Sequence, residues 1–262
     1  MSSQQVQLRF WQGAPTVFVR DLTGNDERCV RDTSTQSAVD LLARLVEWPA
    51  GSDADVDELT APDRDRLLAA IYQRAFGKKI DSTATCTACS SPYDLGFALE
   101  DLFAALDRST GSSTTQVLDD GTFRTSSGLR FRLPTARDEM EVSELPLEKA
   151  EQALASLCIV ESSAGDSLST LEDAIEEVAP VLDLDIDTAC PECGARQGVR
   201  FDMQFYLLSA IERERAHVLR EIHRIASAYG WSLEEILVLE RNDRRALVQL
   251  IEGDLAARRR GQ

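Results

Sequence analysis

Apolar and polar residues alternate in two pairs of short stretches, and this alternation predicts two β-hairpins. Residues 6–10 and 16–20 alternate on either side of a Gly-Ala-Pro segment, which predicts a hairpin at the start of the chain. Residues 115–118 and 129–133 have the same character, and an Asp-Asp-Gly turn follows the first of them. We therefore expect a second hairpin in the middle of the chain.

In other segments apolar residues recur at steps of three and four residues, which predicts helices. The predicted helices cover residues 35–47, 61–76, 99–106, 147–158 and 170–179. Polar stretches at 107–115 and 161–169 predict a linker and an exposed loop. Residues suited to helix ends stand at the expected places, namely Thr60 with Asp63, Thr135 with Asp138 and Ser169 with Glu172 at helix starts, and Gly77 at a helix end.

The last third of the chain gives the clearest helical pattern. An apolar stripe begins at Leu208 and predicts a helix of about 25 residues that ends at Gly230. Its members are Ile211, Val218, Ile222, Ile225 and Tyr229. A Ser232–Glu235 capping box predicts a second helix, and residues 242–252 predict a third. We interpret the stripe as intramolecular core, with a docking surface for another protein as the open alternative.

The composition narrows the possible functions. The chain has 262 residues and a net charge of −17, and 43% of its residues are hydrophobic, which suffices for a proper core. No apolar run approaches the ~20 residues of a membrane span, and residues 1–13 lack a signal-peptide pattern, so we expect a cytoplasmic protein without membrane contact. An acidic chain repels phosphates, and residues 258–260 form its one short basic run, so we expect no nucleic-acid partner.

Two Cys-x-x-Cys pairs carry the strongest chemical signal: Cys86 with Cys89, and Cys190 with Cys193. Six cysteines placed at random would give about 0.1 such pairs. Two thiolates three residues apart on a tight turn can bind one metal ion, and two such turns supply the four tetrahedral sulfur ligands of a structural Zn²⁺ site. Because this site leaves no position open for water or substrate, we expect a structural Zn²⁺ and no catalytic residues.

Each cysteine pair lies between two stretches that read as strands, so we expect each pair at the tip of a hairpin. Residues 79–85 and 93–97 flank the first pair, and residues 182–187 and 199–201 flank the second. A Phe follows each pair at the same distance, Phe97 in one case and Phe201 in the other. The two hairpins are therefore a weak internal repeat.

The separation of the two pairs leaves several arrangements open. Residues 90–189 lie between them, whereas zinc sites of this type commonly have gaps of ~15–20 residues. We favour one zinc ribbon with a large insertion over two half-sites that a second chain completes. Redox or disulfide chemistry is less favoured, because a redox motif is usually a single pair that opens a helix. We expect Cys29 and Cys158 to be small buried hydrophobic residues, and His217 and His223 to be surface residues.

These elements predict an α+β protein that is mostly helical. It combines a zinc-ribbon-like pair of cysteine turns, separated by a large insertion, with a C-terminal helical region. We expect an N-terminal part at 1–107 with the first pair, a linker at 108–114, a hairpin-and-helix insertion at 115–185, and a final part at 186–262 with the second pair and the C-terminal helices.

Several segments also resemble a known family. They are RDLTGNDE at 20–27, APDRDRLL at 61–68 leading to Phe76, Gly77 and the first cysteine pair, FRLPT at 131–135, residues 154–158, CPECG at 190–194, Phe201 with Asp202, EIH at 221–223, AYGW at 228–231, and Arg244 with Arg245. In these segments the chain resembles the baseplate hub assembly chaperones of T-even-type phages. Related proteins are encoded with contractile tails and phage-tail-like injection systems. The resemblance covers about residues 20–253.

The resemblance implies a cytoplasmic, non-enzymatic factor that binds baseplate or hub proteins and helps to assemble the hub. It offers no catalytic motif. Three other functions stay open at this point: a zinc-ribbon regulator of transcription or nucleic acid, a thiol enzyme that uses the Cys-x-x-Cys pairs, and a permanent subunit of the baseplate. The acidic charge disfavours the first of them.

Overall fold

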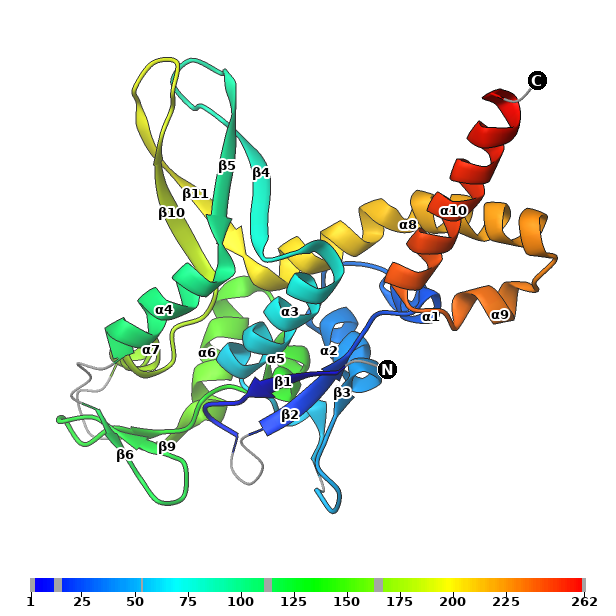
Figure 1. Ribbon diagram of the computed structural model, residues 1–262. Helices are drawn as coiled ribbons and strands as arrows, with labels where there is room; N and C mark the ends of the chain where they lie inside the picture. The colour runs from blue at the N-terminus through cyan, green and yellow to red at the C-terminus, as the bar shows by residue number, and fades with distance from the viewer. Residues whose placement is uncertain (1–2, 12–15, 53, 111–114, 163–166, 261–262) are drawn as a thin grey trace.

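The fold is a mixture of helices and short antiparallel sheets, seen in a computed structural model that describes residues 3–11, 16–52, 54–110, 115–162 and 167–260 (Figure 1). Its sheets are a three-stranded sheet, a four-stranded sheet and two separate hairpins. Among the described residues, no helix is long and apolar enough to cross a membrane. The expected α+β class with a large helical share is confirmed.

The elements occur twice along the chain in the same order. The first repeat, residues 3–110, begins with β1 (Ser3–Gln7) and continues with β2 (Thr16–Arg20), α1 (Gly24–Cys29), α2 (Thr35–Leu45), β3 (Val46–Glu47), α3 (Ala61–Phe76), β4 (Lys79–Thr85), β5 (Pro92–Ala98) and α4 (Leu99–Thr110). The second repeat, residues 116–229, contains β6 (Gln116–Val117), β7 (Phe123–Arg124), β8 (Arg130–Phe131), α5 (Ala136–Val142), α6 (Leu147–Cys158), β9 (Ile159–Glu161), α7 (Leu168–Val178), β10 (Asp183–Ala189), β11 (Arg196–Asp202) and α8 (Met203–Tyr229).

The match between the repeats holds at the level of residues. Residues 17–46 correspond to 129–158 without a gap, and residues 79–110 correspond to 183–214. Two differences remain: a short 3₁₀ helix, η1 (Val56–Glu58), precedes α3 in the first repeat, and three short strands instead of two precede the first helix of the second repeat. The predicted large insertion between the cysteine pairs therefore consists of the second repeat's own sheet and helices.

An Arg-x-x-Thr-x-x-Asp stretch opens the first helix of each repeat. In both copies the Thr and Asp form a capping box, as predicted for the second copy. The Arg donates two hydrogen bonds to the Asp carboxylate, at 2.7 and 2.9 Å in the first repeat and at 2.6 and 2.7 Å in the second. The residues are Arg20, Thr23 and Asp26 in the first repeat and Arg132, Thr135 and Asp138 in the second.

The sheets differ from the predicted hairpins in their pairing. In the opening hairpin β1 lies at 3–7 instead of 6–10, because the backbone N–H groups of Arg9 and Phe10 instead bind the carboxylate of Asp63. Its predicted turn at 13–15 lies outside the described residues. In the second sheet β6 does not pair with β8, because a tight turn with Gly121 at φ 77° returns the chain to β7. Strand β8 lies between β7 and β9.

Several predicted helix ends also shift. Thr60 precedes α3 as expected, but its side chain makes no capping bond, and Asp63 binds the chain after β1 instead. Helix α7 is capped by Ser167 with Thr170, so the predicted box of Ser169 and Glu172 is wrong. Helix α2 ends at Leu45, and α4 continues to Thr110, into the predicted linker. Residues 111–114 of that linker and 163–166 of the predicted loop lie outside the described residues.

The main core lies in the middle of the molecule, where α2, α3, the first sheet and the start of α8 meet. Leu41, Leu42, Leu67 and Leu68 are completely buried there. The core also contains residues at the roots of both cysteine hairpins, which are therefore anchored in it. A smaller core around Phe123, Phe131 and Leu171 joins the second sheet to α7.

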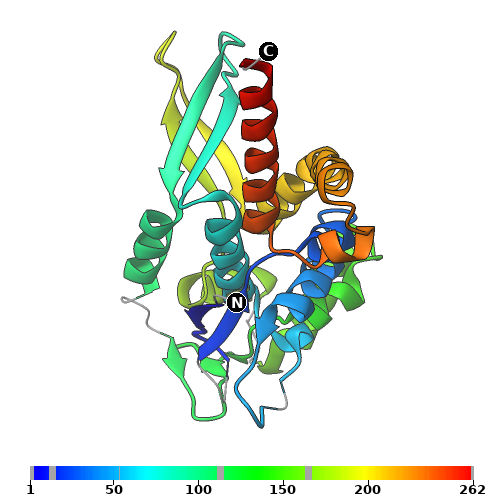
Figure 2. The same cartoon turned by 45° about the vertical axis from the view of Figure 1, so that its right-hand side comes forward.

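The C-terminal helices follow the prediction closely. Helix α8 ends at Gly230, which has the left-handed φ of 72°. Three members of its stripe, Ile211, Val218 and Ile225, are buried, as expected for core, whereas Tyr229 is exposed. The predicted capping box opens α9 (Leu233–Leu237), and α10 (Arg241–Arg260) is longer than predicted. Both views show the end of α10 projecting from the body (Figures 1 and 2).

Candidate metal centre

The two Cys-x-x-Cys pairs meet at the tips of the hairpins β4–β5 and β10–β11, which project side by side from the body (Figures 1 and 2). The four sulfur atoms all lie within 4.8 Å of one another. The Sγ of Cys86 is 3.6 Å from that of Cys193, and the Sγ of Cys89 is 3.7 Å from that of Cys190. One chain therefore brings all four predicted ligands together, with two from each repeat.

The two cysteine turns have the same backbone geometry. In each, the carbonyl of the first Cys accepts a hydrogen bond of 2.9 Å from the residue after the second Cys. The N–H of the first Cys donates to the carbonyl of the residue two positions after the second Cys. This bond joins Cys86 to Ser91 at 3.0 Å and Cys190 to Ala195 at 2.9 Å. The strands below pair in the same register, Thr85 with Pro92 and Ala189 with Arg196.

This turn requires a left-handed backbone directly after the second cysteine. Gly194 supplies it in the second repeat with φ 74°, without steric cost. In the first repeat Ser90 occupies the same position with φ 59°. It is the one described residue other than glycine with a positive φ. A side chain in this conformation costs ~1–2 kcal/mol, so the shared turn is strained in the first repeat.

Each pair contributes one buried and one exposed thiol. Cys86 and Cys190 are buried in a small apolar cluster between the hairpins, together with Ala84 and Tyr93, whereas Cys89 and Cys193 face solvent. The inner sulfur atoms are thus fixed by packing, and the outer ones remain accessible to an arriving ion.

Gln197 joins the two hairpins beside the cysteines. Its side-chain oxygen accepts hydrogen bonds from the backbone N–H and the hydroxyl of Thr87, at 2.8 and 3.1 Å. Its NH₂ group donates to the carbonyl of Thr85 at 3.1 Å and to the hydroxyl of Tyr93 at 3.0 Å. Nothing in the sequence indicated this role. The matching position in the first repeat is Tyr93 itself, so equivalent residues contact each other.

The two phenylalanines that follow the cysteine pairs are also equivalent residues that contact each other. The rings of Phe97 and Phe201 pack edge to face with their centroids 5.0 Å apart. The equal spacing of these residues from the cysteines was the sequence signal for this contact. The two hairpins are therefore held together at the tip by thiols, in the middle by Gln197 and at the root by aromatic packing.

The exposed thiols differ in acidity. Hydrogen bonds from Ser91 lower the pKa of Cys89 to about 6. The N–H of Ala195 lowers the pKa of Cys193, but the hydrogen bonds with Cys89 and Cys86 outweigh it and raise that pKa to about 12. The cluster therefore forms a first thiolate readily and resists further ones until a cation balances them.

The remaining cysteines and histidines lie away from the cluster. Cys158 is buried against the second sheet, and burial raises the pKa of its thiol to about 11. Burial also raises the pKa of the half-buried Cys29. His217 and His223 are exposed on α8, as expected.

A second group of polar residues, which the sequence did not reveal, joins α1 to α8 and α10. The carboxylate of Glu27 binds both Arg241 and Arg244, and all three side chains are buried. Arg244 also contacts Glu221 at 3.1 Å. Gly24 permits this approach, because a Cβ there would stand 2.8 Å from Leu237. Glu27 is 214 and 217 residues from its two arginines in the sequence, so no local pattern marked these pairs.

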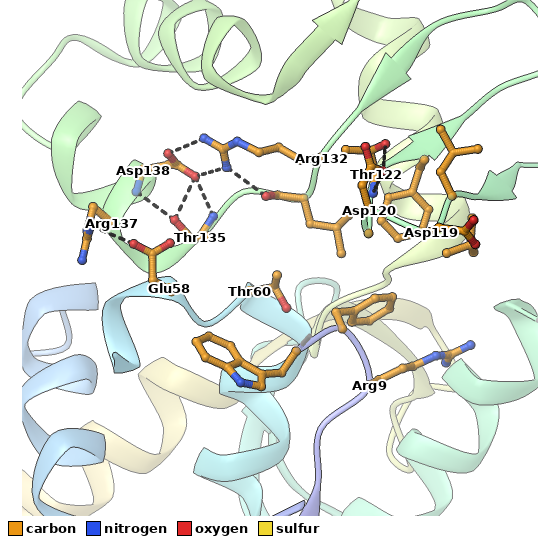
Figure 3. A pocket seen from close by; sticks show the side chains of 17 residues that line it. Arg9, Glu58, Thr60, Asp119, Asp120, Thr122, Arg132, Thr135, Arg137 and Asp138 are labelled. Carbon is orange, nitrogen blue, oxygen red and sulfur yellow. Dashed lines mark hydrogen bonds and ion pairs between the residues drawn. The ribbon is translucent and has the colours of Figure 1, made fainter. Parts of the chain in front are cut away.

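An open pocket of about 900 Å³ lies between the end of β1, the start of α3 and the second sheet (Figure 3). Its charged side chains are largely paired with one another, Arg132 with Asp138 at 2.6 Å and Arg137 with Glu58 at 2.7 Å. Among the described residues that line it there is no histidine or cysteine.

The four-cysteine cluster is the clearest candidate site in the described part of the chain, because it gathers ligands of one chemical type at metal-binding distance. The arrangement is compatible with a metal ion that has only protein ligands. Comparison with family models, with curated proteins and with solved structures finds no match to this chain.

Proposed function

We propose that the chain is a cytoplasmic, non-enzymatic assembly factor for the baseplate hub of a contractile phage tail or a related injection system, built around a structural Zn²⁺. One observation carries this proposal: segments that resemble the hub assembly chaperones, although far apart in the sequence, contact each other. Glu27 from the first segment binds Arg244 from the last, and Arg244 binds Glu221 from a third. The resemblance therefore falls on residues that together hold the fold.

The spacing of the sulfur atoms supports zinc as the ion. Zn–S bonds are about 2.3 Å long, and a tetrahedron of such bonds places its sulfur atoms about 3.8 Å apart. The contacts between Cys86 and Cys193 and between Cys89 and Cys190 are 3.6 and 3.7 Å. Four thiolates suit zinc better than harder cations, and they leave no position for a substrate. The ion's role in this proposal is structural.

In this proposal the ion fastens the first repeat to the second. The hairpin roots already lie in the main core, where Ile80 and Phe201 are buried. The tips project beyond it, where the small cluster around Ala84 and Tyr93 and the hydrogen bonds of Gln197 hold them. Together the hairpins β4–β5 and β10–β11 form a projecting arm. Metal binding and folding are coupled, so an ion at the tips gives this arm one fixed shape. A fixed, projecting arm suits a protein that binds other proteins.

The charge of the chain also fits an assembly factor. A net charge of −17 favours reversible contacts that weaken with salt, and it opposes binding to nucleic acid. An assembly factor must release its subunit once the hub is complete. Reversible polar contacts allow such release, whereas a large permanent apolar interface does not.

The test is to produce the tagged chain together with the tail genes and to compare two fractions. We expect hub or baseplate proteins to co-purify with the chain from assembly intermediates, and we expect finished particles to lack it. The chain in finished particles at fixed stoichiometry would identify a permanent subunit, and DNA or RNA binding at low salt would identify a regulator. A Cys86→Ser variant should lose the hub proteins, whereas a Cys29→Ser variant should retain them.

A further inference from the structure

Helix α10 lies on the first repeat in the way that α3 lies on the second. Each helix starts directly after an antiparallel bridge to the capping threonine of its repeat, Glu240 to Thr23 for α10 and Thr60 to Thr135 for α3. In each helix, the arginine four residues after the bridge forms an ion pair with the glutamate that directly follows the Arg-x-x-Thr-x-x-Asp stretch. These pairs are Arg244 with Glu27 and Arg64 with Glu139.

The two helices differ in how well their apolar residues are covered. On α3, Leu67, Leu68 and Ile71 are almost fully buried, because the first sheet and α8 pack against them. The matching residues of α10 are Leu247, Val248 and Ile251, and all three are only partly buried. Beyond them Leu255 is 44% exposed. Part of the surface that is covered on α3 is therefore open on α10.

The open surface faces the end of α8 across a groove of about 730 Å³. Both helices contribute apolar side chains to it, Tyr229 from α8 and Ile251 with Leu255 from α10. Figure 2 shows the end of α10 standing clear of the body, with α8 running away from it. The groove thus lies between two diverging helices, at a place that the described chain does not fill.

The charged residues of the groove are mostly basic, in contrast to the chain as a whole. Arg224, Arg258 and Arg259 line it, against the single carboxylate of Asp254. Arg224 is paired with Glu252 at 2.6 Å. Arg258 and Arg259 are exposed and have no ion pair within the described residues. In a protein of net charge −17, a basic apolar groove favours an acidic occupant.

We propose that the groove between α8 and α10 binds an amphipathic helix of a partner protein whose apolar stripe is flanked by acidic residues. The stripe packs on Tyr229, Ile251 and Leu255, as one helix packs on two others in a bundle, and the acidic residues pair with Arg258 and Arg259. The proposal rests on the proposed function, because it names the kind of surface that a hub protein must offer.

The test uses fluorescence anisotropy with the whole, zinc-loaded chain and a synthetic 20-residue peptide. The peptide has Leu at helical spacing and Glu at its flanks. One control peptide has the same composition in scrambled order, and a second keeps the stripe but replaces Glu with Lys. We expect the Glu peptide to bind at least about tenfold more tightly than either control, and we expect high salt to weaken it.

Variants of the chain locate the binding surface. Arg258→Glu with Arg259→Glu should weaken the Glu peptide at least about tenfold, and Leu255→Ala should weaken it by a smaller factor. The matched control is Arg28→Glu with Arg31→Glu, which makes the same change of charge at two exposed positions, one in the last turn of α1 and one just after it, and should leave binding unchanged. Equal zinc content and thermal stability of the variants show that each has folded.

Other outcomes would overturn the proposal. Equal binding of the three peptides, or equal weakening by the two double variants, would show that only general charge acts. Self-association that Arg258→Glu with Arg259→Glu abolishes would show that a second copy of this chain fills the groove. Hub proteins that co-purify equally with that double variant would refute the groove and leave the proposed function standing.

Discussion

Asp65 offers a test of how the two repeats are joined, because it is buried where they meet. It lies on α3 of the first repeat and accepts a hydrogen bond of 2.7 Å from the N–H of Leu182, at the root of the second cysteine hairpin. Burial raises the pKa of Asp65 to about 7, although that hydrogen bond lowers it. The folded protein therefore holds this proton more tightly than the unfolded chain does.

The direction of the pH effect follows from this shift. The folded pKa is about 7 and the usual value is 3.8. Stability is therefore fully present below pH 4 and is lost as the pH rises toward 7, where the folded protein must ionise the group. A pKa difference of about three, at about 1.4 kcal/mol per pH unit, means that ionising Asp65 in the folded protein lowers its stability by at most about 4 kcal/mol at pH 8. Asp65→Asn keeps an oxygen for Leu182 and removes this cost.

We therefore expect Asp65→Asn to be more stable than the natural chain, with a difference that grows by about 2 kcal/mol between pH 5.5 and pH 8. The measurement is urea unfolding of both zinc-loaded proteins across this range. Asp101→Asn, an exposed change on α4, is the matched control and should give a constant difference. A constant difference for Asp65→Asn as well would refute the reasoning, because it would mean that Asp65 titrates alike in the folded and unfolded chain.

Three further predictions concern the cysteine turns and the buried charges. Cys86→Ser should abolish stoichiometric zinc binding and lower the melting temperature, whereas Cys29→Ser should retain the metal, as native mass spectrometry can show. Ser90→Gly should stabilise the zinc-loaded protein by about 0.5–1 kcal/mol in urea unfolding, because it relieves a left-handed side chain at some entropic cost, and Gly194→Ser should destabilise it. Glu27→Gln should cost about 3 kcal/mol, because it removes the buried carboxylate that Arg241 and Arg244 share and leaves them only the less buried Glu214 and Glu221; a loss below 1 kcal/mol would contradict this.

The sequence revealed the parts of the site that depend on local spacing. The strands around the first cysteine pair were predicted almost residue by residue, and those around the second pair were predicted at the right place but too short, because the cysteines themselves mark each turn. The capping box at Thr135 and the end of α8 at Gly230 were visible for the same reason. In each case the signal and the structure lie within a few residues of each other.

The parts that were missed depend on contacts between distant segments. Gln197 binds Thr87, and Glu27 binds Arg244, and neither pair shares a local pattern. The second sheet was paired wrongly because its strands are only two or three residues long, too short for alternation to specify a partner. The repeat itself left a trace, the recurring Arg-x-x-Thr-x-x-Asp stretch, which becomes clear once the hairpins are matched.

The repeat accounts for the unusual distance between the cysteine pairs. A zinc ribbon with an insertion would have to tolerate many residues inside one small unit, whereas here each repeat carries its own hairpin and contributes half of the ligands. Two thiols cannot complete a tetrahedron, so neither half can hold an ion in a closed site alone. An ion at the tips therefore requires both hairpins in their docked positions. Separation of the tips would therefore release the ion, and the ion adds to the contacts of Gln197 and Phe201 that already join the two hairpins.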